Sequence, residues 1–160
     1  MWNLGSINID VVYSVPHIPV PGETLAATER ATYLGGKGAN MSVAIARSGS
    51  RVYHIGAIGQ DGLWTSERLL EYGVDTQHIS IVDGPTSQAV VAVDLQGENA
   101  IILAPGASVN IPHKTLQTAL SEASTGDWFI TQNETNLQRT AVTLAKKMGL
   151  KVGYAAAPFD

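Results

Sequence analysis

The chain has 160 residues, of which 44% are hydrophobic and 15% are charged, a composition typical of a globular protein rather than a disordered one. Its net charge of −4, without a basic cluster, argues against a nucleic-acid partner. The sequence has no cysteine, which excludes disulfides and suits a cytoplasmic protein, and it has no apolar run of membrane-spanning length.

Residues 1–15 are expected to form an opening strand, because apolar residues alternate there with Asn8 and Asp10. That alternation places both polar side chains on one face, about 6–7 Å apart. The proline-rich residues 16–22 are unsuited to an internal strand. Residues 24–34 form a mostly polar extended segment whose mixed faces indicate a flap.

Residues 35–40, Gly-Gly-Lys-Gly-Ala-Asn, form a glycine turn before a helix that ends near Ser48. Such a turn leaves unpaired N–H groups that face a ligand, and Lys37 and Asn40 add polar side chains. A phosphate-binding P-loop would need glycine in place of Ala31 and Ser or Thr in place of Gly38. The dinucleotide pattern also fails, so the turn is predicted to bind something other than a nucleotide phosphate.

The rest of the chain alternates between strands and helices. A buried-type strand at 51–59 precedes a helix that Asp61 is expected to cap and Gly73 to end. Strands at 87–95 and 100–104 form a hairpin, which is expected to pair with the flap in a small separate sheet. The later elements are a helix opened by 110–112, a strand at 127–131, a helix at 137–148 and a strand from 151.

This order predicts a layered α/β fold with a mostly parallel central sheet. Parallel sheets are covered on both faces, and this chain stops just after a strand. We therefore expect residues 1–160 to be the N-terminal half of a larger domain.

Six short motifs, in this order and spacing, closely resemble ribokinase and its sugar-kinase relatives. They are Gly-Ser-Ile-Asn-Ile-Asp at 5–10, Pro-Gly-Glu-Thr at 21–24, the glycine turn at 35–40, Ile-Gly-Gln-Asp-Gly at 58–62, Leu-Glu-Tyr-Gly-Val at 70–74 and Ala-Pro-Gly-Ala at 104–107. The resemblance covers the whole chain. It implies a ribokinase-like α/β/α fold, with this chain as the sugar-binding half and lid segments at about 16–34 and 87–104.

The resemblance implies an ATP-dependent kinase that phosphorylates the hydroxymethyl group of a small sugar, and D-ribose is the sugar expected. The residues it assigns to the sugar are Asn8, Asp10, Gly36, Lys37, Asn40 and Glu134. It also implies ATP and Mg²⁺, with a monovalent cation as a further ion, and a homodimer formed through the lid. The catalytic Asp and the nucleotide pocket belong to the second half of such kinases, so we assign neither here and expect this chain alone to be inactive.

Several alternatives stay open. Glu134 has the position of a helix cap, and Lys37 that of an exposed first-turn lysine, although a lysine there opposes the helix dipole. Residues 155–157 are alanines where ribokinases usually have an Asn, which puts one polar contact of the site in doubt. The four histidines lack ligand spacing, so no metal site is expected. As a whole, the chain is alternatively a non-catalytic sugar-binding or dimerising module, or part of a kinase for fructose or a nucleoside.

Overall fold

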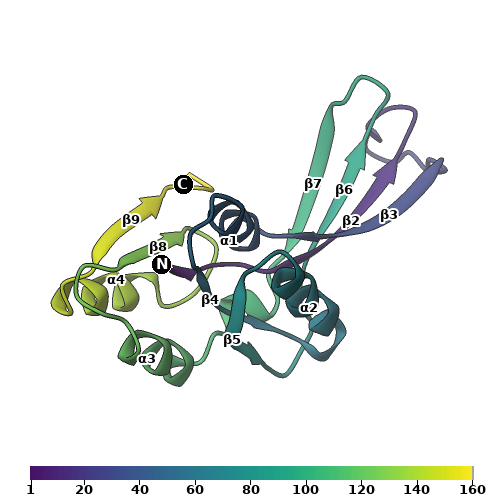
Figure 1. The fold of residues 1–160 in the computed structure, drawn as a ribbon. Helices are drawn as coiled ribbons and strands as arrows, with labels where there is room; N and C mark the ends of the chain where they lie inside the picture. The colour runs from purple at the N-terminus through teal and green to yellow at the C-terminus, as the bar shows by residue number, and fades with distance from the viewer. Residues whose placement is uncertain (160) are drawn as a thin grey trace.

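The computed structural model describes residues 1–159 and has a larger and a smaller sheet (Figure 1). The larger sheet has five strands in the order β5-β4-β1-β8-β9, and every neighbouring pair is parallel. Its strands are β1 (Trp2–Leu4), β4 (Tyr53–Ile58), β5 (Asp75–Ile81), β8 (Trp128–Gln132) and β9 (Lys151–Ala155). The chain adds strands on one side of β1 and then on the other. The carboxyl end of β1 therefore lies where the strand order reverses, which is where open α/β sheets bind ligands.

Helices cover both faces of this sheet, as the layered α/β prediction requires. They are α1 (Lys37–Arg47), α2 (Leu63–Glu71), α3 (His113–Ser121) and α4 (Gln138–Lys147), with short 3₁₀ turns η1 (Gln60–Gly62) and η2 (Ala107–Val109). One core cluster packs α3 and α4 against buried residues of the central strands, with Leu4 and Phe129 fully buried. A second cluster, which contains Ala39 of α1 and Leu69 of α2, occupies the other face. No helix within residues 1–159 is long and apolar enough to cross a membrane.

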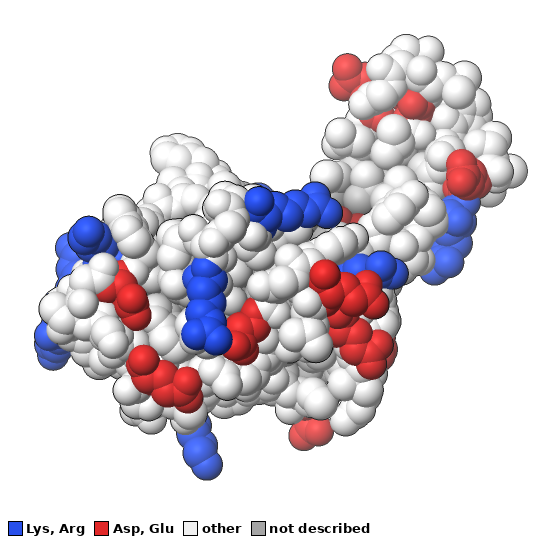
Figure 2. Space-filling view, viewed as in Figure 1, with Lys and Arg blue, Asp and Glu red and all other residues white. Residues whose placement is uncertain are grey.

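The smaller sheet stands away from this three-layer body (Figure 1). Its strands are β2 (Asn8–Ser14), β3 (Glu29–Gly35), β6 (Ser87–Val93) and β7 (Asn99–Ala104), in the order β3-β2-β6-β7. The hairpin β6–β7 and the separate small sheet confirm the prediction. On the face shown in Figure 2, basic and acidic side chains are interspersed over the body and this sheet.

The structure corrects the prediction of a single opening strand. β1 and β2 belong to different sheets and are separated by residues 5–7. Gly5 still donates a hydrogen bond to the Ile55 carbonyl, at 3.1 Å, whereas Asn8 pairs with Gly35 and Ser87 of the small sheet. The alternation of residue types continues through the junction, so it does not reveal the change of partner.

Two further predictions need correction. Asp61 does not cap α2, because its Oδ1 accepts hydrogen bonds from the backbone and hydroxyl of Thr86, at 2.9 and 2.8 Å, and Gly62 precedes the helix without a side-chain cap. Strand β5 was not predicted from its largely polar sequence. It lies at the edge of the sheet, where a strand needs fewer apolar residues.

The glycine turn packs directly on the end of β1. A Cβ added to Gly38 would lie 2.4 Å from both the Gly5 Cα and the Ser6 nitrogen. Gly36 has a φ of 95°, a conformation that favours glycine, and Ala39 donates a backbone hydrogen bond of 2.9 Å to Ser6. The backbone contact between the turn and β1 therefore requires residues without side chains.

We expect Gly38→Ala to destabilise the chain by about 3 kcal/mol or more, because the new methyl group would overlap backbone that cannot move aside. A change from glycine to alanine inside a helix ordinarily stabilises the protein by about 1 kcal/mol. A loss of stability in Gly38→Ala would therefore by itself indicate the overlap. Urea unfolding would measure the effect. Gly153→Ala is the matched control, since its Cβ would meet only an ordinary contact at 3.7 Å; equal stability of the two variants would contradict the prediction.

Candidate functional site

A cavity of about 180 Å³ lies between the start of β2, the glycine turn and the segment after β8. It is lined by Asn8, Asp10, Gly36, Lys37, Asn40, Ala89, Val91, Ile101, Leu103 and Glu134. This set includes all six residues that the family resemblance assigned to the sugar. The four that were not nominated are apolar side chains of β6 and β7, which form the wall contributed by the hairpin.

Glu134 joins the segment after β8 to the glycine turn. Its Oε2 accepts hydrogen bonds from the Ser6 hydroxyl, at 2.5 Å, and from the Lys37 backbone, at 3.3 Å, while its Oε1 pairs with the Lys37 ammonium group. The Glu134 side chain is only 5% exposed, and α4 begins later, at Gln138, without a side-chain cap. Glu134 is therefore not the cap of α4. It also supplies the negative charge that makes Lys37 tolerable at the start of α1.

Asp10 provides a second carboxylate in the cavity. A Cβ added to Gly35 would lie 2.0 Å from the Asp10 Oδ2, so the carboxylate packs directly on that glycine. Its Oδ1 is buried and has no hydrogen-bond donor among residues 1–159. Burial raises the pKa of Asp10, the nearby Glu134 raises this pKa further, and Lys37 acts in the opposite direction. A buried acceptor without a donor is a group that a ligand hydroxyl would satisfy.

A buried network of polar side chains supports the glycine turn from below. Asn3 donates to the Gly38 carbonyl and to the Ser42 hydroxyl, each at 2.8 Å, and Ser42 contacts the His54 Nδ1 at 2.8 Å. The His54 Nε2 lies 3.2 Å from the Gly5 carbonyl. Because a carbonyl only accepts, the His54 proton is on Nε2, and the Ser42 hydroxyl donates to Nδ1.

This network was not predicted from the sequence. The available signal was a polar residue inside each of two buried strands, Asn3 in β1 and His54 in β4, both with no exposed surface. Such residues need partners, and here both bond to Ser42 of α1. Burial lowers the pKa of His54 from 6.5 to about 4, so the ring is neutral at pH 7.

Among the described residues, no three His, Cys, Asp or Glu side chains group closely enough to hold a metal ion. The polar groups of the cavity are carboxylates, amides and one ammonium group beside an apolar wall. This set hydrogen-bonds neutral polyhydroxy ligands, which both donate and accept.

A family model described as pfkB family carbohydrate kinase matches residues 3–151. The ribokinase of Haemophilus influenzae is 38% identical over 160 residues, covering 97% of this chain and 52% of that protein. The chain belongs to the pfkB family of carbohydrate kinases. The predicted resemblance to ribokinases is thereby confirmed.

Solved structures of this family have the same fold. The ribokinase of Cryptococcus neoformans var. grubii, in complex with ADP, matches with a TM-score of 0.83 and 38% identity, over 98% of this chain and 50% of that one. The Arabidopsis thaliana ribokinase complexed with ribose and ATP gives a TM-score of 0.83 at 27% identity, over 98% and 53%. The chain thus spans about half the length of the pfkB-family relatives it matches.

The buried imidazole makes stability depend on pH. The unfolded chain binds a proton at His54 below pH 6.5, whereas the folded chain keeps the ring neutral down to about pH 4. Stability should therefore fall by on the order of 3 kcal/mol as the pH drops through this window. Thermal melts at pH 4 to 7 would measure it. His54→Gln, which retains an N–H donor, should flatten the dependence, and an unchanged slope in this variant would refute the assignment.

The two charges beside Asp10 should shift its pKa in opposite directions. Glu134→Gln removes a neighbouring negative charge and is expected to lower the Asp10 pKa, whereas Lys37→Gln removes a positive charge and is expected to raise it. A titration of the Asp10 carboxyl carbon followed by NMR would report both shifts. Shifts of the same sign in the two variants would contradict this electrostatic arrangement.

Proposed function

We propose that this chain contributes the sugar-binding half of an ATP-dependent kinase that transfers the γ-phosphate to the hydroxymethyl group of D-ribose. The observation that carries the proposal is the cavity that collects all six predicted residues, with an unpaired buried oxygen on Asp10. The ribose assignment draws support from relatives named ribokinase and from the Arabidopsis ribokinase complexed with ribose and ATP.

The chemistry of the cavity suits a sugar. The Asp10 carboxylate accepts hydrogen bonds from hydroxyl groups, Asn8 and Asn40 both donate and accept, and the Lys37 ammonium group donates. Apolar residues of β6 and β7 provide a surface for the carbon face of the ring. The volume of about 180 Å³ is below the roughly 300–1,000 Å³ of pockets that bind drug-sized ligands, which favours one small sugar.

ATP with Mg²⁺ would supply and neutralise the transferred phosphoryl group. We assign neither of them, nor a monovalent cation, to any residue of this chain, and we place the base that deprotonates the acceptor hydroxyl in a second half. A general base is typically worth about 10²–10⁴-fold in rate. The 160-residue chain alone is therefore proposed to bind the sugar without phosphorylating it, and the enzyme is proposed to be cytoplasmic.

We further propose that the small sheet is a lid over the sugar and forms a homodimer contact. The support is its apolar character: Ile101 and Ile102 of β7, on opposite faces of the strand, are 59% and 72% exposed. An exposed apolar edge strand is normally covered by another surface. Analytical ultracentrifugation of the full-length protein would test the dimer.

A coupled ATPase assay of the full-length protein over a sugar panel would test the function. We expect D-ribose to be phosphorylated with a kcat/KM at least tenfold above those for fructose and nucleosides, and the 160-residue chain to show no turnover. A preference for fructose or a nucleoside would reassign the acceptor. Binding of ribose without turnover by the full-length protein would instead indicate a non-catalytic module.

Asp10→Asn in the full-length enzyme should weaken ribose binding roughly ten- to a hundredfold, because a hydrogen bond to a charged group is worth about 1.5–3 kcal/mol. ATP affinity should be unchanged. Isothermal titration with each ligand would measure both. Asp83→Asn, at an exposed position outside the cavity, is the matched control. An equal loss of affinity for ribose and ATP would show misfolding rather than a ribose contact.

A further inference from the structure

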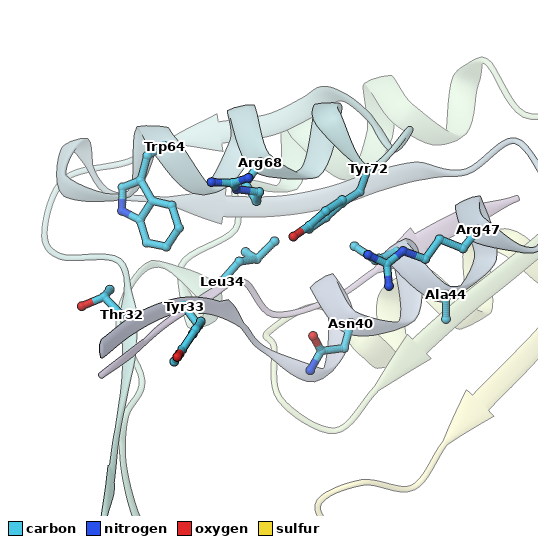
Figure 3. A pocket seen from close by; sticks show the side chains of 10 residues that line it. Thr32, Tyr33, Leu34, Asn40, Ala44, Arg47, Trp64, Arg68 and Tyr72 are labelled. Carbon is cyan, nitrogen blue, oxygen red and sulfur yellow. The ribbon is translucent and has the colours of Figure 1, made fainter. Parts of the chain in front are cut away.

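A second and larger cavity, of about 630 Å³, lies on the other side of the glycine-turn helix, between β3, α1 and α2 (Figure 3). Figure 3 shows Trp64, Arg68 and Tyr72 on the α2 side and Arg47 on the α1 side. The sugar cavity shares only Asn40 with it. None of the other lining residues has a part in the proposed kinase chemistry.

The charge of this cavity is opposite to that of the protein. Two arginines line it and no acidic residue does, although the whole chain carries a net charge of −4. Arg47 has no carboxylate partner within residues 1–159, and its Cζ lies 4.9 Å from the centre of the Tyr72 ring. Arg68 pairs with Glu71 at 2.9 Å, but both of these side chains are at least half exposed, so this ion pair is weak. Both guanidinium groups therefore remain available to an anion.

The remaining surface is suited to a planar group. Trp64 is half-buried in the wall, and Tyr72 is 37% exposed although its ring already carries a guanidinium group. Aromatic side chains beside arginines stack on flat rings, while the guanidinium fork pairs with phosphate or carboxylate oxygens. A volume of about 630 Å³ falls within the range of pockets that hold small organic ligands.

We propose that this arginine–aromatic cavity binds a small organic anion in which a phosphate or carboxylate is attached to a planar ring. Arg47 and Arg68 hold the anionic group, and Trp64 and Tyr72 contact the ring. The site is distinct from the sugar cavity, whose Asp10 and Glu134 carboxylates repel such a ligand. The proposal of this second site does not depend on the acceptor being ribose, or on the chain belonging to an active kinase.

Phenyl phosphate is the test ligand. Phenol and inorganic phosphate, which each represent one half of it, are the comparison ligands. We expect the full-length protein to bind phenyl phosphate at least tenfold more tightly than either half, with quenching of tryptophan fluorescence. Benzoate separates the two anionic groups, and tighter binding of benzoate than of phenyl phosphate would identify a carboxylate ligand within the same proposal.

Substitutions locate the site. Arg47→Gln and Arg68→Gln should each weaken phenyl phosphate binding at least fivefold, and Trp64→Phe should abolish most of the quenching. Arg139→Gln, an equal charge change at an exposed position on α4, is the matched control and should leave binding unchanged. Circular dichroism melts would verify that every variant is folded.

Two results would overturn the proposal. One is that neither phenyl phosphate nor benzoate binds more tightly than phenol or inorganic phosphate. The other is a loss of affinity in Arg139→Gln as large as in Arg47→Gln, which would indicate general electrostatic attraction. Ribose titrations of the same variants distinguish the two proposals. Failure of ribose to bind would contradict the proposed function but not the arginine–aromatic site.

Discussion

The arrangement of the candidate site depends on the contact between the backbones of Gly5 and Gly38. A side chain on either glycine would come within 2.4 Å of the other. This contact places the start of α1 directly on the carboxyl end of β1, the position at which an open α/β sheet binds ligands. Lys37 can then reach Glu134, which follows β8, the neighbour of β1 on the side opposite β4. One close backbone approach thus brings together residues that are almost a hundred positions apart.

Much of the fold could be predicted because its signals are local. The glycine turn with its helix and the hairpin were read from short stretches. Five of the six site residues came from motifs whose order matched a family, and Glu134 came from its position after a central strand. What could not be predicted depends on distant partners. Alternation assigns residues to faces, but it cannot show that Asn8 has left the sheet of Leu4. In the same way, the bond from Thr86 to Asp61 spans 25 residues, and a capping rule does not consider it.

Helix α1 has different surroundings on its two sides. On one side, Lys37 lies beside two carboxylates, in a small cavity where burial raises the pKa of Asp10. On the other side, Arg47 lies beside the Tyr72 ring in a larger cavity that no acidic residue lines. Underneath, the neutral His54 and its hydrogen-bonded neighbours fill the space between the helix and the sheet without adding charge. Buried polar groups therefore support the helix, while charged groups are kept to its two open sides.

The short connection between β1 and β2 has a mechanical consequence. Only residues 5–7 join β1 of the body to β2 of the small sheet, and the polar groups that line the cavity are divided between the two parts: Asn8 and Asp10 are built into the small sheet, whereas Glu134 belongs to the body. Any rotation of one part against the other would separate these groups or bring them together. The width of the cavity therefore follows from the angle at which the small sheet leaves the body, and residues 5–7 and Gly36, the two short links beside the cavity, set that angle together.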